Sequence, residues 1–219
     1  MSDERPPFLA QKAPMKIDLH THSSTGSACS RQGVIQIASD ALCRGLDAVC
    51  VTDHNNKRAA EEAELITADT SFLILIGMEV TAEEGDFLIF GSDRAGYPLL
   101  PYERLRAEVD LARCAVIPAH PYRGGAYRET VSIARRFTSD FCGLEVYSVN
   151  MTEADSRDAL DLAAELGLPA IGCSDSHRPG TAGLNYTEFD DEIGSVEQLV
   201  AAIKSGRFRA VKADYDVTG

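Results

Sequence analysis

The chain alternates short apolar runs with longer stretches in which apolar residues recur every three or four positions. Short apolar runs are typical of buried strands, and the longer period is typical of helices that pack on one side. We expect strands at Met15–His22, Leu46–Val51, Phe72–Ile76, Ala115–Pro118, Gly143–Tyr147, Pro169–Cys173 and Phe208–Val211, with Val80–Ala82 and Phe87–Phe90 as a hairpin. The expected helices are Val34–Leu42, Arg58–Ile66, Tyr102–Arg113, Thr130–Phe137, Thr152–Leu166 and Ser195–Ser205.

Strands and helices that alternate in this way form parallel β-α-β units. An open doubly wound sheet and a closed barrel both fit the alternation. Polar residues follow the ends of several strands, and this favours the barrel, in which all strand ends meet on one face and build the active site. On the first strand, we expect Ile17 and Leu19 on the buried face and Lys16 and Asp18 on the opposite face.

All five histidines of the chain follow expected strands. His20 and His22 end the first strand, and residues two apart on a strand share a face, so their imidazoles can be directed at one point. His54, His120 and His177 come directly after later strands. Because imidazole is the commonest metal ligand in proteins, this distribution indicates a metal site.

The composition is that of one folded domain. Of 219 residues, 44% are hydrophobic, which is enough for one sizeable core. We expect a single domain at 15–219 after a flexible extension at 1–14. That extension lacks the basic and apolar regions of a secretory signal, and no apolar run approaches the length of a membrane span. Six cysteines without CxxC spacing are expected to be reduced, largely buried thiols, which indicates a cytoplasmic protein.

The formal net charge of −13 argues against a nucleic-acid partner, whose phosphates need a basic surface. It also argues against binding to an anionic membrane. The expected partner is therefore a small molecule, and the sequence indicates no particular oligomeric state.

Six short motifs occur in order along the chain: HTH (20–22), TDHN (52–55), GMEVT (77–81), PAHPYR (118–123), GLEVY (143–147) and SDSH (174–177). Together they resemble the polymerase-and-histidinol-phosphatase (PHP) superfamily, over nearly the whole chain from about Met15 to Val211. The resemblance implies a distorted seven-stranded (β/α)7 barrel, similar to a TIM barrel, with two or three divalent cations at its C-terminal face. It also implies metal-dependent hydrolysis of phosphate esters.

The resemblance further implies eight metal ligands, which are His20, His22, His54, Glu79, His120, Glu145, Asp175 and His177. Glu79 would bridge two of the cations, and Glu79, Asp175 and His177 are the residues expected to act in catalysis. His54 and His177 would hold the third cation. Many family members supply one more ligand to that third cation from the loop after the first motif. Here the matching position falls near Ala28, so the third site is weaker, absent or completed by Cys29.

A mixed imidazole and carboxylate set suits Zn²⁺, Mn²⁺ or Fe²⁺ better than Mg²⁺ or Ca²⁺, which prefer oxygen ligands. Arg123 and Arg178 follow two of the motifs and are expected to bind an anionic substrate, because a guanidinium group holds phosphate through two parallel hydrogen bonds. Asp53 is expected either to orient a neighbouring ligand or to cap a turn.

These observations predict a metal-dependent phosphoesterase that acts on a small phosphorylated metabolite, such as a nucleotide or a sugar phosphate, through metal-activated water at a di- or trinuclear site. Two alternatives remain: a hydrolase of amides or lactones, as in the related amidohydrolase barrels, and a metal-binding accessory domain without turnover. Substrate specificity is expected in the loops at 23–31, 91–100, 124–130 and 178–191.

Overall fold

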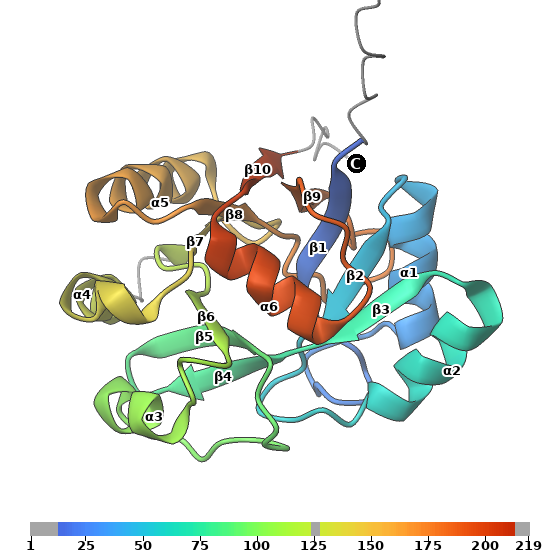
Figure 1. Ribbon diagram of the computed structural model, residues 1–219, viewed down its shortest axis with the longest axis horizontal. Helices are drawn as coiled ribbons and strands as arrows, with labels where there is room; N and C mark the ends of the chain where they lie inside the picture. The colour runs from blue at the N-terminus through green and yellow to red at the C-terminus, as the bar shows by residue number, and fades with distance from the viewer. Residues whose placement is uncertain (1–12, 124–127, 213–219) are drawn as a thin grey trace, which may run out of the picture.

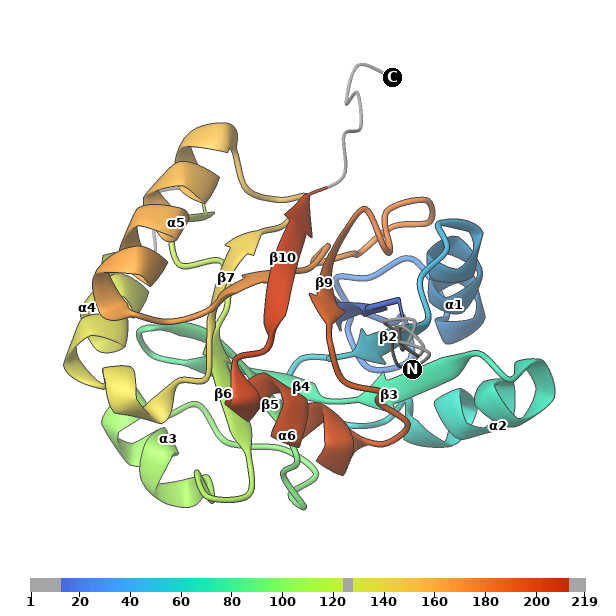
Figure 2. The same cartoon turned by 45° about the horizontal axis from the view of Figure 1, so that its top comes forward.

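The computed structural model describes residues 13–123 and 128–212 (Figure 1). Residues 1–12 of the expected extension and residues 124–127 of an expected specificity loop lie outside the described residues. The described chain has the expected mixed α/β fold, in which helices lie around the strands (Figure 2).

The first part of the fold consists of parallel β-α-β units. Its elements are β1 (Met15–Thr21), α1 (Val34–Cys43), β2 (Ala48–Val51), α2 (Ala60–Thr70) and β3 (Leu73–Ile76). The strands β1, β2 and β3 pair side by side in parallel, and the two helices connect them. Every residue of β2 is buried, as expected for a central strand with helices on both faces of its sheet.

An antiparallel sheet follows, formed by β4 (Met78–Ala82), β5 (Gly85–Phe90) and β6 (Ala115–Pro118). The pairing of β4 with β5 confirms the expected hairpin. The helix α3 (Tyr102–Glu108) is shorter than expected because Val109 already has an extended backbone. After β6 come α4 (Arg128–Arg136) and a short 3-10 helix at Thr138–Asp140.

The strands β7 (Leu144–Tyr147) and β8 (Ala170–Gly172) pair in parallel, and α5 (Glu153–Leu166) connects them. Thr152 and Asp155 cap the start of α5 reciprocally, since each side chain accepts a hydrogen bond from the other residue's backbone N–H. Gly167 ends the helix with a φ of 66°, a left-handed conformation that favours glycine.

The strand β9 (Asn185–Phe189) lies in a stretch for which the sequence predicts a loop. It pairs antiparallel with β1 and with β10 (Phe208–Lys212), which follows α6 (Val196–Ser205). The sequence pattern does not indicate this strand, because polar residues usually mark exposed positions, whereas those of β9 are buried and hydrogen-bonded. The hydroxyl group of Thr187, for example, accepts from the Gly172 N–H and donates to the Gly172 carbonyl.

The expected closed seven-stranded barrel is not confirmed. The described strands form three sheets, in the orders β10-β9-β1-β2-β3, β4-β5-β6 and β7-β8. A closed barrel needs a continuous backbone ladder around the ring. Where two of these sheets meet, a few single contacts replace the ladder. The Cys142 N–H donates to the Val116 carbonyl between β6 and the start of β7, and the Thr187 hydroxyl group joins β9 to β8. A side chain at Gly172 would clash with the Tyr186 carbonyl, so β8 and β9 approach too closely for any other residue.

The central core lies between the first sheet, the antiparallel sheet and α6. Its fully buried members include Ile17, Leu19, Leu88, Ile117, Leu199 and Ile203. Helix α6 crosses in front of the strands in Figure 1, and its residues in this cluster cover the apolar side of β1. The central core therefore holds fixed the strand that carries the first two histidines.

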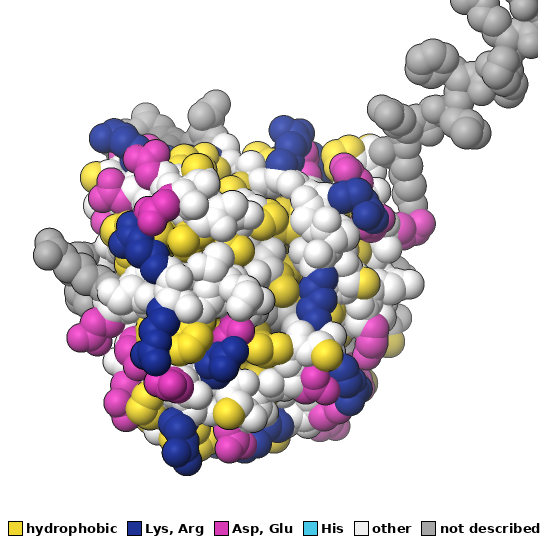
Figure 3. Space-filling model, turned by 60° about the vertical axis from the view of Figure 1, so that its left-hand side comes forward, with side chains coloured by type: hydrophobic (Ala, Val, Ile, Leu, Met, Phe, Trp, Pro, Cys, Tyr) yellow, Lys and Arg dark blue, Asp and Glu magenta, His cyan; other side chains and the backbone are white. Residues whose placement is uncertain are grey.

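The surface agrees in part with the composition. On the face shown in Figure 3, basic and acidic side chains are interspersed and no imidazole is visible. No helix in the described ranges is long and apolar enough to cross a membrane. All six cysteines are free, but only Cys50, Cys114 and Cys173 are buried, whereas Cys29 and Cys43 are exposed, contrary to expectation.

Asp18 fastens β1 to two other parts of the chain. Its carboxylate is completely buried and accepts from the backbone N–H of His20 at 3.2 Å, of Ser174 at 2.9 Å and of Gly183 at 2.8 Å. The Ser174 hydroxyl group donates to it as well. Burial raises the pKa of Asp18 to about 6, although the bonds from Ser174 and Gly183 oppose the rise.

We expect Asp18→Asn to lower the free energy of unfolding by about 1–3 kcal/mol, because the amide turns an NH₂ group toward a backbone donor and leaves that donor unsatisfied. Chemical denaturation measures the change. Asp69→Asn, an exposed change on α2, is the control and should alter stability by less than about 0.5 kcal/mol. Equal stability of the two variants would show that Asp18 does not fasten these segments.

Candidate metal centre

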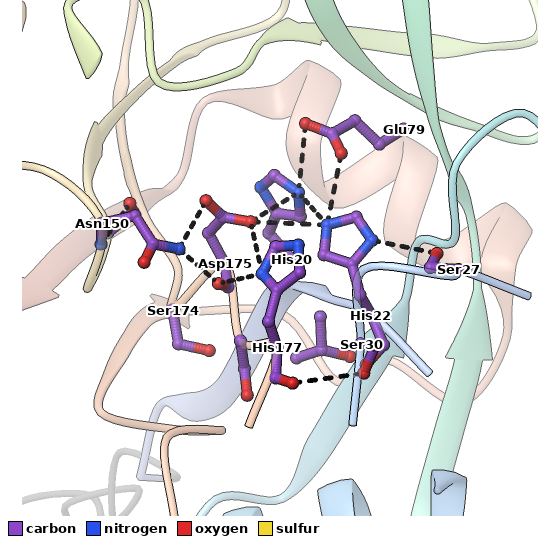
Figure 4. Close-up of polar contacts among 12 residues, drawn as sticks. His20, His22, Ser27, Ser30, Glu79, Asn150, Ser174, Asp175 and His177 are labelled. Carbon is purple, nitrogen blue, oxygen red and sulfur yellow. Dashed lines mark hydrogen bonds and ion pairs between the residues drawn. The ribbon is translucent and has the colours of Figure 1, made fainter. Parts of the chain in front are cut away.

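The strand ends converge, and they bring the predicted ligands together. His20 lies on β1 and His22 just after it, His54 follows β2, Glu79 is on β4, His120 follows β6, Glu145 is on β7, and Asp175 and His177 follow β8. Figure 4 shows Glu79 and Asp175 reaching the imidazoles of His20 and His22 from different sides. All but His54 and His177 are buried, and those two are partly exposed.

The inner group consists of His20, His22, Glu79 and Asp175. The Nε2 atoms of the two histidines lie 2.9 Å apart. Asp175 Oδ1 is 3.5 Å from His20 Nε2 and 3.4 Å from His22 Nε2. Glu79 places Oε1 at 3.4 Å from the first nitrogen and Oε2 at 3.2 Å from the second. Four side chains thus direct their metal-binding atoms at one small volume.

These separations fit a shared cation. Two ligand atoms that each lie about 2.1 Å from the same ion stand about 3.0–3.4 Å apart at octahedral or tetrahedral angles. In the described ranges, the buried oxygens Glu79 Oε2 and Asp175 Oδ1 make no hydrogen bond and have only imidazole nitrogens as ion-pair partners, although such oxygens are normally hydrogen-bonded. A divalent cation would satisfy both oxygens and both Nε2 atoms at once.

Glu79 also reaches beyond the inner group. Its Oε1 lies 2.9 Å from His120 Nε2, and its Oε2 lies 3.0 Å from His54 Nδ1. The two oxygens therefore face different imidazoles, which is the arrangement required of a carboxylate that bridges two cations. Asp86 of β5, which the sequence reasoning missed, groups with Glu79 and His120 as a further carboxylate. Its signal in the sequence is a charged residue at the start of an otherwise apolar strand.

Glu145 contacts the edge of the His20 ring that faces away from the inner group. Its Oε2 lies 3.2 Å from His20 Nδ1 and accepts from the His120 backbone N–H at 3.0 Å. Because Nδ1 is on the opposite side of the ring from Nε2, this contact orients His20 toward the inner group. The role of Glu145 as a direct ligand stays a prediction.

Asp53 supports His22 through a hydroxyl group. Ser27 Oγ donates to Asp53 at 2.6 Å and lies 3.3 Å from His22 Nδ1. Asp53 also accepts from the Ser23 backbone and hydroxyl groups. A side chain at Gly26 would clash with this carboxylate, so the loop can close on Asp53 only with glycine there. The Ser27 hydroxyl group thus links Asp53 to His22, which is compatible with the expected role of Asp53 in orienting a neighbouring ligand.

The outer oxygen of Asp175 is anchored separately from the inner one. Asp175 Oδ2 accepts from Arg123 at 2.8 Å and from the Asn150 amide at 2.8 Å. These bonds leave Oδ1 directed at the imidazoles. His120 and Asp175 have positive φ values of 29° and 51°, so both of these ligand positions are held in strained backbone conformations.

A cleft of ≈ 550 Å³ opens beside the centre. It is lined by Cys29, Arg31, Arg123, Asn150, His177 and Arg178. The cleft contains both arginines that the sequence singles out, and it adds Arg31, which sequence reasoning missed because it lies at the end of a loop without a motif. Among the described residues, neither Arg31 nor Arg178 pairs its guanidinium group with a carboxylate.

The charges of the centre depend on one another. Burial lowers the pKa of His20, but the carboxylates of Glu79, Asp175 and Glu145 outweigh it and hold that pKa well above its usual value. The same attraction raises the pKa of His22 and of His120. Burial raises the pKa of Glu79, but His20 and His120 outweigh this effect and hold it well below its usual value.

The pKa values of Asp175 and His177 are lowered for related reasons. The pKa of Asp175 is lowered because the His20 and His22 imidazoles outweigh the effect of burial. The pKa of His177 is lowered by burial and by the neighbouring His22. In the absence of a cation, the carboxylates and the buried imidazoles therefore stabilise each other as ion pairs.

Comparison with known proteins relates the chain to one family. A family model described as PHP-associated matches residues 154–208. The fold also resembles a two-domain protein of Bacteroides vulgatus that contains a predicted PHP-like metal-dependent phosphoesterase, with a TM-score of 0.71 and 19% identity over 95% of this chain and 68% of that one. The six-motif resemblance is thereby confirmed. Both findings support membership of the PHP superfamily.

Two other solved structures and one curated protein are also similar to this chain. PsfC of Pseudomonas syringae has a TM-score of 0.68 and 16% identity over 93% of each chain. An amidohydrolase of Chromobacterium violaceum, solved with bound sulfate and no metal, has a TM-score of 0.62 and 19% identity over 76% of this chain and 89% of that one. An uncharacterized protein of Methanocaldococcus jannaschii is 25% identical over 121 residues, 49% of this chain and 68% of its own length.

The pKa shifts predict how stability depends on pH. The lowered pKa values of Glu79 and Asp175 contribute stability that is complete above their usual range, about 4, and is lost as the pH falls through the folded values. The raised values of His20, His22 and His120 contribute stability that is complete below about 6.5 and is lost as the pH rises. The metal-free protein should therefore be most stable between these limits.

We expect the chelated protein to melt at a higher temperature at pH about 6 than at about 8.5. Divalent metal should raise the melting temperature more at pH about 8.5, because ligands bind metal only when deprotonated. Thermal melts of chelated and metal-loaded protein at both pH values measure this. A chelated protein that melts at the same temperature at both values would contradict the charge assignment.

Proposed function

We propose that this PHP protein is a metal-dependent hydrolase of phosphate esters, with a small phosphorylated metabolite of the nucleotide or sugar phosphate class as its substrate. The observation that carries the proposal is the inner group, in which four buried side chains direct metal-binding atoms at one volume with separations of 2.9–3.5 Å. Relatives of this fold named as metal-dependent phosphoesterases support the reaction class. We also propose that it acts in the cytoplasm.

The ligands divide between an inner cation and its neighbours. His20, His22, Glu79 and Asp175 would hold one cation, and Glu79 with His120 would hold a second, next to Glu145. The residue types suit Zn²⁺, Mn²⁺ or Fe²⁺. When bound, such cations lower the pKa of water to near neutrality and neutralise charge on the phosphate oxygens.

The protein's own residues then bind and orient the ester. The guanidinium groups of Arg31 and Arg178 lie at the cleft and pair with no carboxylate of the described residues, and each can hold a phosphate through two parallel hydrogen bonds. Arg123 lies deeper, between Asp175 at 2.8 Å and Asp86 at 3.9 Å. Its charge both fixes Asp175 and draws an anion toward the inner group.

A second candidate is hydrolysis of an amide or lactone, which the likeness to the Chromobacterium amidohydrolase favours. The three arginines at the cleft argue for an anionic substrate over a neutral one. Rates on a panel of phosphomonoesters and phosphodiesters, compared with rates on amides and lactones under the same metal loading, decide between the two.

We expect the purified protein to contain at least two equivalents of Zn, Mn or Fe and to hydrolyse a phosphate ester in a chelator-sensitive way. Elemental analysis, with the hydrolysis rate before chelation, after chelation and after metal is restored, tests both points. A rate that survives complete removal of metal would contradict the proposal, as would no rate on any ester with metal bound.

Glu79→Gln should lower the rate of ester hydrolysis by more than about 100-fold. Changes to the outer partners of metal ligands already cost about 10- to 100-fold, and Glu79 faces the imidazoles directly. The matched control is Glu61→Gln, an exposed change on α2, which should leave the rate unchanged. A folded Glu79→Gln variant with normal turnover would remove Glu79 from the bridging position.

Arg178→Ala should raise KM with little change in kcat, because this arginine binds the ground state and the transition state alike. Arg123→Ala should lower kcat as well, since it also releases Asp175 Oδ2. Steady-state kinetics on the best ester separates the two patterns, with the exposed Arg104→Ala as control. An unchanged KM in Arg178→Ala would exclude contact with the substrate.

A further inference from the structure

Two segments that carry the inner group belong to strands that do not pair with each other. One segment ends β1 and holds His20 and His22, and the other follows β8 and holds Asp175. In the sheets of the described strands, β1 lies between β9 and β2, whereas β8 pairs with β7. The two segments meet in an isolated bridge between Thr21 and Ser176. Side chains must therefore help to set the distance between them.

The side chain of Gln32 lies across this junction and is only 1% exposed. Its amide Nε2 is 3.2 Å from the His22 carbonyl oxygen, 3.0 Å from the Ser176 carbonyl oxygen and 2.7 Å from the Ser176 hydroxyl oxygen. Because carbonyl oxygens only accept hydrogen bonds, the NH₂ group must face both segments. Gln32 Oε1 has no hydrogen-bond partner among the described residues, so the amide acts as a donor.

The backbone around Gln32 is fixed as well. Gln32 stands two residues before Val34, the fully buried first residue of α1. The Ser24 N–H donates to the Gln32 carbonyl at 2.8 Å, and the Arg31 N–H donates to the His177 carbonyl at 2.9 Å. The amide therefore donates from a position that the chain on either side of it holds in place.

Gln32 complements the contact that Asp18 makes between the same two segments. Asp18 lies before the ligands of β1 and bonds to Ser174, which lies before the ligands that follow β8. Gln32 bonds to the backbone of His22, at the end of the first group of ligands, and to Ser176, within the second. The two segments are thus joined at both ends of the stretch that carries the ligands.

We propose that Gln32 is a positioning residue of the metal centre, whose amide sets the distance between the segment that ends in His22 and the segment from Asp175 to His177. Ligand distances at a bound cation vary by only about 0.2 Å, so a small shift between the segments weakens binding. This role rests on the metal centre of the proposed function, but it does not require that the substrate be a phosphate ester.

Gln32→Met keeps the length of the side chain and removes the donor. We expect it to weaken metal binding by about 10-fold, which is the lower end of the loss seen when residues that orient metal ligands are changed. Gln32→Glu should weaken binding further, because its carboxylate would face two carbonyl oxygens. The matched control is Gln36→Met, since Gln36 is exposed on α1 and its amide donates to Asp40 of the same helix.

The test is a titration of metal-free protein with Co²⁺, followed by visible absorption, whose position and intensity depend on the geometry of the ligands. Wild type and Gln36→Met should give the same affinity and spectrum, and both Gln32 variants should show weaker binding and an altered spectrum. Ser176→Ala removes one of the three acceptors. It should lower the affinity less in Gln32→Met than in the wild type, because directly interacting residues are not additive.

Circular dichroism establishes that each variant folds. A folded Gln32→Met variant with the affinity and spectrum of the wild type would overturn the positioning role, as would an equal loss in Gln36→Met. Either result leaves the proposed function standing if the wild type hydrolyses an ester with metal bound. Co²⁺ binding that depends on Gln32, without hydrolysis of any ester, contradicts only the proposed function. A wild type that binds no Co²⁺ contradicts both.

Discussion

The fold depends on the neutralisation of buried carboxylates by imidazoles. Glu79, Asp175 and Glu145 are all essentially excluded from water, where an isolated carboxylate would be very unfavourable. Each lies within about 3.5 Å of a histidine nitrogen, and those histidines come from other strands. No pair can be moved without exposing an uncompensated charge. The strand ends are therefore fixed relative to one another by the same groups that would hold the cations.

The places where one sheet meets the next coincide with these buried charges. Asp18 is two residues before His20 on β1, so both project from the same side of the strand. It bonds to Ser174, which directly precedes Asp175, and thereby joins two ligand-bearing segments that are also linked by an isolated bridge between Thr21 and Ser176. Polar side chains replace a continuous ladder, and this allows the sheets to diverge while the ligands stay in register. A fully closed barrel would not need such contacts.

The sequence predicts most of the elements, and it picks out the candidate ligands that the strand ends bring together, because both leave local signals. Apolar runs mark β2 and β3, and histidines after strands mark the centre. Asp18 shows the limit of such reasoning: it alternates with Ile17 and Leu19 and is therefore expected on the opposite face, yet that face is buried too. The same difficulty conceals β9, since Asn185 and Thr187 appear polar and are buried by bonding. Ser27, Asp86 and Asn150 act through contacts between distant segments, which no local pattern records.

The net charge of −13 and the arginines of the cleft are compatible because they act at different ranges. At physiological salt, charges more than about 8 Å apart in solvent are largely screened. A small phosphorylated molecule in the cleft therefore interacts with Arg31, Arg123 and Arg178 far more strongly than with acidic residues elsewhere. A long polyanion would extend beyond the cleft and meet the acidic surface along its length. This charge distribution supports the proposal that the substrate is a small phosphorylated metabolite and not a nucleic acid.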